Sequence, residues 1–261
     1  MLKFKELFKV ICNKFLIKNY NKYCPICNSK TYFLPISTYY LTMWQKYGFV
    51  YSIFDFETFN TPEYSCAKCT ASDRDRLYAL YFKKNFEKNI NLKILDIGFS
   101  EVFKKFINKN YSNINYHTLD KFNINAKYKL DVEDMNELND ESYDFIICSH
   151  VLEHVNNPTN AVKEIYRILK NKGKAIIMVP ILLSLENTLE NPEYNTDELR
   201  WKYYGQNDHL RMFSKKDFVD LLKNASFEVK ELNIDYFGKN VFEQNGISEK
   251  SVLYLCVKNE K

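Results

Sequence analysis

Four cysteines near the start of the chain are spaced to bind a metal ion. They form two Cys-x-x-Cys pairs, with Cys24 and Cys27 in "CPIC" and Cys66 and Cys69 in "CAKC". Each pair lets two sulfurs converge from one tight turn, and Zn²⁺ prefers four thiolates in a tetrahedron. Because four protein ligands leave no open position, the pattern predicts a structural zinc site; free or redox-active thiols are the alternative.

Two of the four histidines lie in the stretch "SHVLEHV" at 149–155. His150, Glu153 and His154 are spaced i, i+3 and i+4, so a helix beginning here would place all three side chains on one face. Histidine has an unperturbed pKa of about 6.5 and suits proton transfer. The three residues could act in catalysis, bind a metal ion, or brace the start of a helix.

These groups need a folded scaffold, and the composition predicts one. The chain has 261 residues, of which 46% are hydrophobic, and a formal net charge of +4. That length allows one large domain or one domain with a small module. The near balance of charge permits a nucleic-acid partner without requiring one. No run of about 18 uncharged apolar residues occurs, so we expect no transmembrane helix.

The N-terminal stretch has lysines throughout an apolar pattern and lacks the uninterrupted apolar core of a secretory signal. We therefore expect a cytoplasmic protein in which Cys12, Cys148 and Cys256 are buried thiols. The same pattern predicts a basic amphipathic helix over residues 1–22. Such a helix could dock on its own domain with the lysines in water, or it could contact a membrane surface or RNA.

The remaining sequence divides into three parts. Residues 23–75 are rich in aromatic and β-branched residues around the cysteine pairs, which predicts a zinc-ribbon-like module. Residues 76–91 follow as a connecting helix, and residues 92–261 form the main domain. We expect Arg74 and Arg76, around the start of this helix, to form surface salt bridges, although they could reach a bound carboxylate or phosphate.

From residue 92, apolar strand-like segments alternate with helical ones. The helical segment after 157 has Asn157 as its cap, Pro158 in its first turn and Gly173 past its end. The pattern predicts an α/β fold with a mainly parallel, seven-stranded sheet covered on both faces. In such sheets ligands bind beyond the carboxyl ends of the strands. The seven predicted strands are "LKILDIG", "INYHTLD", "AKYKLDV", "YDFIICS", "KAIIMVP", "FEVKELNI" and "SVLYLCVKN".

The order of these motifs resembles the class I S-adenosylmethionine-dependent methyltransferases across roughly residues 90–261. These enzymes have a Rossmann-like, doubly wound fold. With its paired cysteines in front, the whole chain is similar to bacterial methyltransferases that begin with a zinc-ribbon-like segment. The motifs that carry the resemblance are "LDIGFSE", "TLDKF", "LDVEDM", "YDFIICSHVLEHV" and "ILKNKGKAIIMVP".

The resemblance implies an S-adenosylmethionine site. Asp96 would approach the methionine end, and Gly98 would let the backbone come close. Asp120 would accept hydrogen bonds from the ribose hydroxyls, and Asp131 from the adenine amine. The Val132 backbone would meet a ring nitrogen. Neighbouring positions of the same motifs add Phe99, Ser100, Lys121, Glu133 and Ser149.

The first motif departs from the family pattern. Ser100 and Val102 stand where further glycines are usual, and Phe99 is bulky. Simple turn roles for Asp120 and Asp131 are the alternative to cofactor binding.

The resemblance also implies candidates for catalysis. His150 directly follows the fourth predicted strand and is the first candidate base, with His209 second. Some related O-methyltransferases hold a divalent ion at this place, and Glu153, His154 and both candidate bases could ligate one. Bracing of the loop is the alternative role of Glu153 and His154. Arg211 belongs to a "DH-x-R" element that faces the active site in similar enzymes.

The acceptor is expected to be a small molecule or a sugar-linked metabolite methylated on oxygen, for example a precursor of a bacterial surface polysaccharide. The long polar and aromatic stretch over 186–213 would bind it or form a lid. An RNA methyltransferase, a sugar C-methyltransferase and a non-catalytic binding protein are the alternatives.

Overall fold

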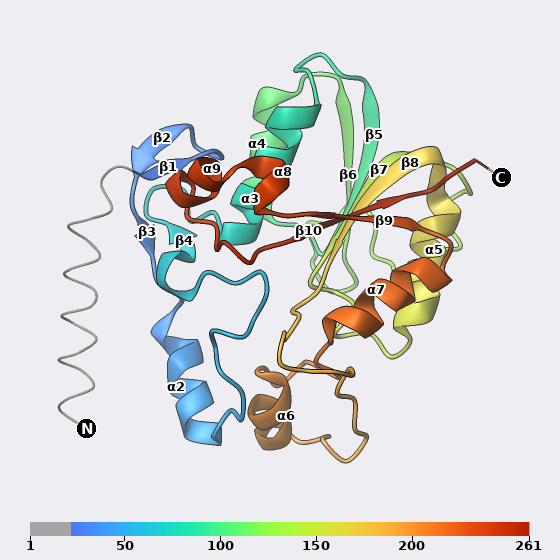
Figure 1. Cartoon of the computed structure of the whole chain (residues 1–261). Coiled ribbons are helices and arrows are strands. Elements are labelled where there is room, and N and C mark those ends of the chain that lie inside the picture. The colour runs from blue at the N-terminus through green and yellow to red at the C-terminus, as the bar shows by residue number, and fades with distance from the viewer. Residues whose placement is uncertain (1–21, 261) are drawn as a thin grey trace.

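A computed structural model describes residues 22–260 of the chain (Figure 1). Cys12 lies outside the described residues, and so does the predicted N-terminal helix apart from Lys22. Among the described residues, no helix is both long enough and apolar enough to cross a membrane.

A twisted six-stranded sheet forms the centre of the molecule, in the order β6-β5-β7-β8-β10-β9. The four strands at one side run parallel, and β10 is antiparallel to both of its neighbours. This is the mainly parallel α/β architecture that the sequence predicts. The strands are β5 (Leu92–Ile97), β6 (Ile114–Leu119), β7 (Tyr143–Ser149), β8 (Leu169–Met178), β9 (Glu228–Leu232) and β10 (Leu253–Val257).

The sheet has six strands in the described residues, so the expectation of seven is wrong for the segment "AKYKLDV". Only Tyr128 of this segment makes a bridge to the sheet, opposite Leu119. Asp131 instead closes a turn, because its carboxylate accepts the backbone N–H of Glu133 at 3.0 Å. A side chain that bonds its own backbone in this way competes with a strand ladder.

Helices cover both faces of the sheet (Figure 1). α3 and α4 pack together on one side, and α5 packs with α7 on the other. Polar caps begin these helices: Ser72 forms a reciprocal capping box with Asp75, and Asn157 accepts the N–H of Asn160. Their bounds are α3 (Asp73–Asn85), α4 (Glu101–Asn110), α5 (Pro158–Ile168) and α7 (Lys215–Asn224).

The helix α5 ends earlier than the sequence predicts. β8 begins at Leu169, so Gly173 lies inside the strand rather than beyond the helix. Lys172 adopts a left-handed conformation with φ 61°, and the pairing with β7 shifts register nearby. This irregular start lets the chain pass directly from helix to strand.

The N-terminal part joins the main domain instead of standing apart. The buried Cys24 and Cys66 belong to the same hydrophobic core as the central strands. α2 packs on α6, a helix from the segment after β8, and both lie at the lower edge in Figure 1. The remaining elements are β1 (Lys22–Cys24), β2 (Ser29–Thr31), β3 (Phe33–Leu34), α2 (Thr38–Tyr47), the 3-10 helix η1 (Thr61–Glu63), β4 (Ser65–Cys66), α6 (Asp197–Tyr204), α8 (Ile234–Phe237) and α9 (Lys239–Gln244).

Candidate functional site

Three adjoining cavities open at the carboxyl ends of β5, β6 and β7, and His150 lines all of them. We call them the acidic cleft, the central cavity and the aromatic cavity, with volumes of about 580, 360 and 100 Å³. The first two volumes fall in the range of small-molecule and cofactor sites. Their position matches the edge where ligands bind in open parallel sheets.

The acidic cleft brings together residues that are distant in sequence. Asp120 follows β6, and Asp131 lies in the turn that replaces the predicted strand. The carboxylate of Asp120 accepts the backbone N–H groups of Phe122 and Asn123, each at 2.8 Å. Lys121 forms an ion pair with Asp131 at 2.7 Å. Burial alone would raise the pKa of Asp131, but Lys121 outweighs it and lowers that pKa. Val132 and Glu133 complete this wall.

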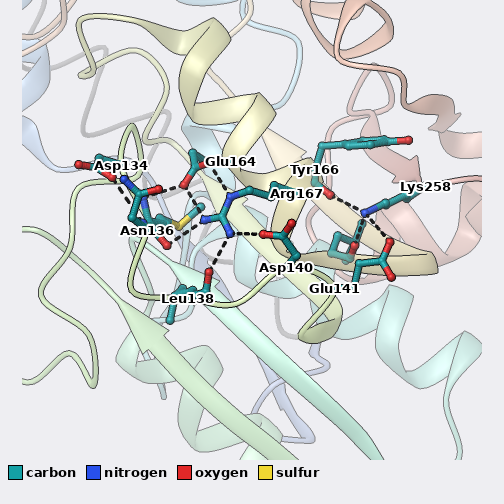
Figure 2. Close-up of polar contacts among 11 residues, drawn as sticks. Asp134, Asn136, Leu138, Asp140, Glu141, Glu164, Tyr166, Arg167 and Lys258 are labelled. Carbon is teal, nitrogen blue, oxygen red and sulfur yellow. Dashed lines mark hydrogen bonds and ion pairs between the residues drawn. The ribbon is translucent and has the colours of Figure 1, made fainter.

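An ionic clamp holds the acidic-cleft wall against α5 (Figure 2). Arg167 donates to both oxygens of Glu164 at 2.7 Å and to the carbonyls of Met135 and Leu138. Glu164 in turn accepts the N–H of Met135 at 2.8 Å. Bidentate arginine–carboxylate pairs of this kind fix geometry well. The segment that follows the turn of Asp131 is therefore anchored to α5.

The central cavity contains the first motif. Gly98 has φ 68°, and a Cβ built on it would lie 2.5 Å from Val151 Cγ2. Both the backbone conformation and the space require glycine there. Ser100, where the family pattern has glycine, serves as the N-cap of α4. Phe99 is buried but does not line any of the three cavities; its ring lies below the Lys104 ammonium.

Asp96 lies buried at the floor of the central cavity. Burial raises its pKa to about 8, although a hydrogen bond donated by the Tyr116 hydroxyl lowers it. The carboxyl group therefore holds its proton at neutral pH when no cation is nearby. Ser149, at the end of β7, shares a hydrogen bond of 2.6 Å with Tyr78.

The polar residues Tyr64, Asp75 and Tyr78 line the central cavity without having been marked by any sequence motif, and Arg74 lines it too, for which contact with a bound carboxylate or phosphate was the alternative expectation. They precede the first motif, on α3 and the loop before it. The prediction of surface salt bridges for Arg74 and Arg76 is wrong. No carboxylate of the described chain lies within 4 Å of the Arg74 guanidinium, and Arg76 is fully buried.

The stretch "SHVLEHV" forms turns after β7, so the helix expected to begin there does not exist. His150 itself has φ 56°, an uncommon conformation for a residue with a Cβ, and its N–H donates to Met178 O at 2.8 Å. Its Nδ1 lies 3.3 Å from Glu153 Oε1. The turn thus still brings His150 and Glu153 together, at the price of local backbone strain.

Glu153 is fully buried, and apart from the 3.3 Å contact with His150 Nδ1 its carboxylate oxygens have no hydrogen-bond partner in the described chain. Burial would raise its pKa, but His150, His209 and His154 outweigh this and lower it to about 2. Burial and the nearby Arg74 lower the pKa of His150 to about 4. His150 is therefore neutral at pH 7 beside an anion, and its buried Nε2 has no partner.

His209 joins this group from the segment after β8. A ligand atom from each of Glu153, His154 and His209 lies within 4.8 Å of the others, so the three could hold a metal ion. His154 Nδ1 contacts the Asp208 carbonyl at 3.1 Å, and His209 Nδ1 contacts the Tyr204 carbonyl at 3.1 Å. Such contacts leave each Nε2 as the acceptor, and Nε2 of His209 is already in contact with the Gln206 side-chain amide at 2.9 Å.

Arg211 lies behind the site instead of facing a cavity. It is 1% exposed, and it donates to the carbonyls of Leu152, Val155 and Asn156 and to both oxygens of Glu190. Its guanidinium therefore fixes the loop that carries Glu153 and has no group left for a ligand in the cavities.

The aromatic cavity is built from two distant segments. Residues 36–64 of the N-terminal part form one wall, and residues 180–209 form the other. Trp44 fixes their contact, because its Nε1 donates to the Gly205 carbonyl at 2.8 Å. Most of the aromatic-rich segment 36–64, which was expected to belong to a zinc-ribbon-like module, is α2 and irregular chain. The high frequency of aromatic residues in this segment was the feature of the sequence that could have indicated a binding surface.

The four cysteine sulfurs of the two pairs converge. Cys24 Sγ lies 3.7 Å from Cys69 Sγ, and Cys27 Sγ lies 4.0 Å from Cys66 Sγ. A tetrahedron with zinc–sulfur bonds of about 2.3 Å has edges of about 3.8 Å, so the arrangement is compatible with a zinc ion. The thiols of Cys24 and Cys69 lower the pKa of Cys66, which favours a thiolate there.

Comparison with known proteins gives the family. A family model described as a methyltransferase domain matches residues 70–232, more than half of the chain. A ubiquinone biosynthesis O-methyltransferase of Rickettsia bellii is 29% identical over 111 residues, which cover 42% of this chain and 45% of that protein. An uncharacterized protein of Methanocaldococcus jannaschii is 36% identical over 102 residues, covering 37% of this chain and 44% of its own. The chain thus spans less than half the length of these curated relatives.

Solved structures show a partial likeness. Phosphoethanolamine N-methyltransferase 2 of Haemonchus contortus, in complex with S-adenosyl-L-methionine, superposes with a TM-score of 0.47 at 13% identity. The match covers 72% of this chain and 53% of that chain.

Proposed function

The chain belongs to the methyltransferase domain family, and from this premise we propose that it transfers a methyl group from S-adenosylmethionine to a hydroxyl of a small acceptor. One observation carries the proposal: His150, with an unpartnered Nε2, lines the two cavities that suit the cofactor and also the aromatic cavity. A base at this junction can reach both the methyl group and its acceptor.

The acidic cleft and the central cavity would hold the two ends of the cofactor. Asp120 has a carboxylate oxygen that is free for the ribose hydroxyls, since the other accepts two backbone N–H groups. Asp131 and the Val132 backbone would meet the adenine. Asp96 would accept the ammonium group of the methionine end, because a cation favours the ionised form of a buried carboxyl.

The methyl group of the cofactor's sulfonium is already activated, so the enzyme mainly has to align the acceptor oxygen with it. The acceptor oxygen attacks the methyl carbon in line with the sulfur, the C–S bond breaks, and its electron pair stays on the sulfur of S-adenosylhomocysteine. The hydroxyl proton passes to Nε2 of His150, which is neutral at pH 7. The buried Glu153 anion, 3.3 Å from Nδ1, would stabilise the imidazolium that forms. His209 has its Nδ1 on the Tyr204 carbonyl, and we give it a positioning role.

A metal-assisted form of the reaction is a second candidate, favoured by the cluster of Glu153, His154 and His209. An ion there would lower the pKa of the acceptor hydroxyl. Titration of the protein with Mn²⁺, followed by electron paramagnetic resonance, tests this independently of turnover. One bound ion that Glu153→Gln removes would support the metal-assisted form, whereas no bound ion, or binding that Glu153→Gln leaves intact, would exclude it.

We also propose that Cys24, Cys27, Cys66 and Cys69 bind a structural zinc ion. The convergence of the four sulfurs, with Cys24 and Cys66 buried and Cys27 and Cys69 partly buried, fits a site with no open position. The zinc site would keep the N-terminal wall of the aromatic cavity in place.

The size of the aromatic cavity favours a small acceptor over RNA or an extended glycan, since about 100 Å³ suits a single ring. The proposed acceptors include a sugar-linked precursor of a surface polysaccharide of which only one ring is bound. We also propose a cytoplasmic location.

The direct test of the proposed base compares His150→Ala with the wild-type protein. Turnover should fall about 10²–10⁴-fold, which is the usual contribution of a general base, while the Kd for S-adenosylhomocysteine stays within a few-fold. His117→Ala is the matched control, because His117 is also buried but bonds to Tyr143 away from the cavities. An active His150→Ala enzyme would remove His150 as the base.

A further inference from the structure

The three cavities differ in charge, and the difference bears on the acceptor. The acidic cleft is lined by four acidic residues, Asp120, Asp131, Glu133 and Asp208, and by two basic ones, Lys121 and Arg200. The central cavity is lined by Asp75 and Asp96 together with Arg74. No acidic residue lines the aromatic cavity, whose charged lining residue is Arg74. A cationic cofactor suits the first two cavities, whereas the third would attract an anion.

Arg74 lies at the boundary between the central and aromatic cavities and lines both. Burial opposes its charge, but Tyr64, Tyr78 and Asp73 raise its pKa, so the guanidinium stays charged. Nevertheless, no carboxylate of residues 22–260 forms an ion pair with it. A buried or half-buried guanidinium is normally paired, and its planar donors match a carboxylate in two-point contact.

The neighbouring Arg76 shows what a structural arginine looks like in this fold. It donates five hydrogen bonds, to the carbonyls of Glu63, Tyr64, Ala71, Asn245 and Gly246. Its donors are used on backbone carbonyls of the protein, whereas the Arg74 side chain lines two cavities and has the Tyr64 hydroxyl as a hydrogen-bond partner. The contrast favours a ligand for Arg74 over a role in stability.

The remaining wall of the aromatic cavity suits a flat ring. Phe59 makes edge-to-face contacts with Phe56, Trp44 and Tyr64, with centroid distances of 5.6, 6.3 and 5.4 Å. These contacts, and the hydrogen bond of Trp44 to Gly205, fix the ring positions before a ligand arrives. An apolar cavity of about 150 Å³ binds benzene, so about 100 Å³ limits the buried part to one ring.

From these observations we propose that the acceptor is a single-ring aromatic carboxylate that carries a hydroxyl group. Its ring lies among Trp44, Phe56 and Phe59, its carboxylate meets Arg74, and its hydroxyl faces Nε2 of His150. The inference rests on the proposed function and names its substrate class. The phenolic oxygen forms the new bond to the methyl carbon, the sulfur keeps the electron pair, and the phenolic proton goes to His150.

The test measures methyl transfer to three hydroxybenzoate isomers, to the matching neutral hydroxybenzamides, and to 4-hydroxycyclohexanecarboxylate. The wild-type protein should prefer the best acid over its amide by about 10- to 100-fold in kcat/KM, because a charge-assisted hydrogen bond contributes that much. The saturated acid should be at least about tenfold worse than the aromatic one, because it cannot stack.

Arg74→Gln should reduce the preference for acid over amide to about twofold, and Arg74→Lys should restore part of it. Lys46→Gln is the matched control, since Lys46 is an exposed cation on α2, in the same lobe. Thermal denaturation verifies that each variant is folded.

Three results would overturn the inference. One is equal transfer to acids and amides by the wild-type protein, and another is preference for the saturated acid. The third is an Arg74→Gln variant that keeps the acid preference but loses affinity for S-adenosylhomocysteine, which would assign Arg74 to the cofactor. No transfer to any of these compounds, while S-adenosylmethionine still binds, overturns the substrate class alone. Failure to bind S-adenosylmethionine overturns the proposed function.

Discussion

The cofactor side and the acceptor side of this site are built in different ways. The acidic cleft and the central cavity draw most of their proposed cofactor contacts from short loops that directly follow β5, β6 and β7. The aromatic cavity is assembled from residues 36–64 and 180–209, which meet through α2 and α6. Local chain geometry therefore sets the first side, and long-range packing sets the second.

This difference has a mechanical consequence. On the cofactor side, the Arg167 clamp holds the segment of Met135 and Leu138, which follows the turn of Asp131, against α5 (Figure 2). The acceptor side depends on the cysteine cluster, on Arg76 and on the contact of Trp44 with Gly205. Perturbations of the N-terminal part should therefore affect acceptor methylation far more than cofactor binding.

Removal of the cysteine cluster should have the largest effect. We expect Cys24→Ser with Cys66→Ser to lose about one zinc per chain and all measurable acceptor turnover, because the wall of the aromatic cavity loses its support. Metal analysis and a turnover assay measure this. Cys256→Ala, a buried cysteine of β10 outside the cluster, should keep both zinc and turnover. A double variant that stays fully active would show that the cluster does not hold the acceptor side.

Loss of the Arg76 side chain should have the second-largest effect, on the stability of the protein. Arg76→Met leaves buried carbonyls without donors, so the free energy of unfolding should fall by about 3 kcal/mol or more. Urea denaturation measures this, with Arg74→Met as the matched control that should cost much less. Equal losses for the two variants would contradict the different roles of the two arginines.

A weaker effect is expected on the cofactor side. Asp120→Ala removes the acceptor for the ribose hydroxyls, and affinity for S-adenosylhomocysteine should fall about 10- to 100-fold. Asp220→Ala on the outer face of α7 should change nothing, since Asp220 pairs only with Lys216 among the described residues. Unchanged affinity in Asp120→Ala would return Asp120 to the role of a turn residue.

The smallest predicted effect is a pH dependence of cofactor binding. Because burial raises the pKa of Asp96 to about 8, the free protein should bind S-adenosylmethionine more tightly as the pH rises from 6 towards 8. The ammonium of the cofactor favours the ionised carboxyl, so binding releases a proton. Calorimetry in buffers of different ionisation enthalpy should detect this release, and Asp96→Asn should abolish it. Proton uptake, or a release that persists in Asp96→Asn, would contradict the assignment.

The same contrast explains what could be predicted from the sequence. Alternating apolar segments indicated the α/β fold and six of the seven expected strands, because strand period and helix caps are local properties. The prediction of the seventh strand was wrong because the Asp131 side chain accepts a hydrogen bond from the nearby backbone N–H of Glu133. The hydrophobic pattern of a sequence carries no information about such a bond. The predicted cofactor residues line the acidic cleft or the central cavity, with the exception of Phe99. Most of them lie at or just beyond the ends of β5, β6 and β7, which the hydrophobic pattern locates.

The acceptor side was not predictable in the same way. The segment 36–64 has no motif, and its pairing with 180–209 depends on contacts across more than a hundred residues. Arg74 was expected on the surface, because nothing in the sequence shows that α3 lies against the carboxyl edge of the sheet. Glu153 and His154 were expected on a helix, although the interaction of Glu153 with His150 arises in a turn.

Calorimetric titration of the zinc-loaded, folded chain with S-adenosylmethionine tests the central claim most directly. We predict a one-to-one complex with a Kd below about 1 mM, because enzymes commonly have KM values between about 1 μM and 1 mM. The absence of binding heat at ~5 mM cofactor, several times that limit, both at pH 7 and at pH 8, would contradict the claim that this chain is an S-adenosylmethionine-dependent methyltransferase.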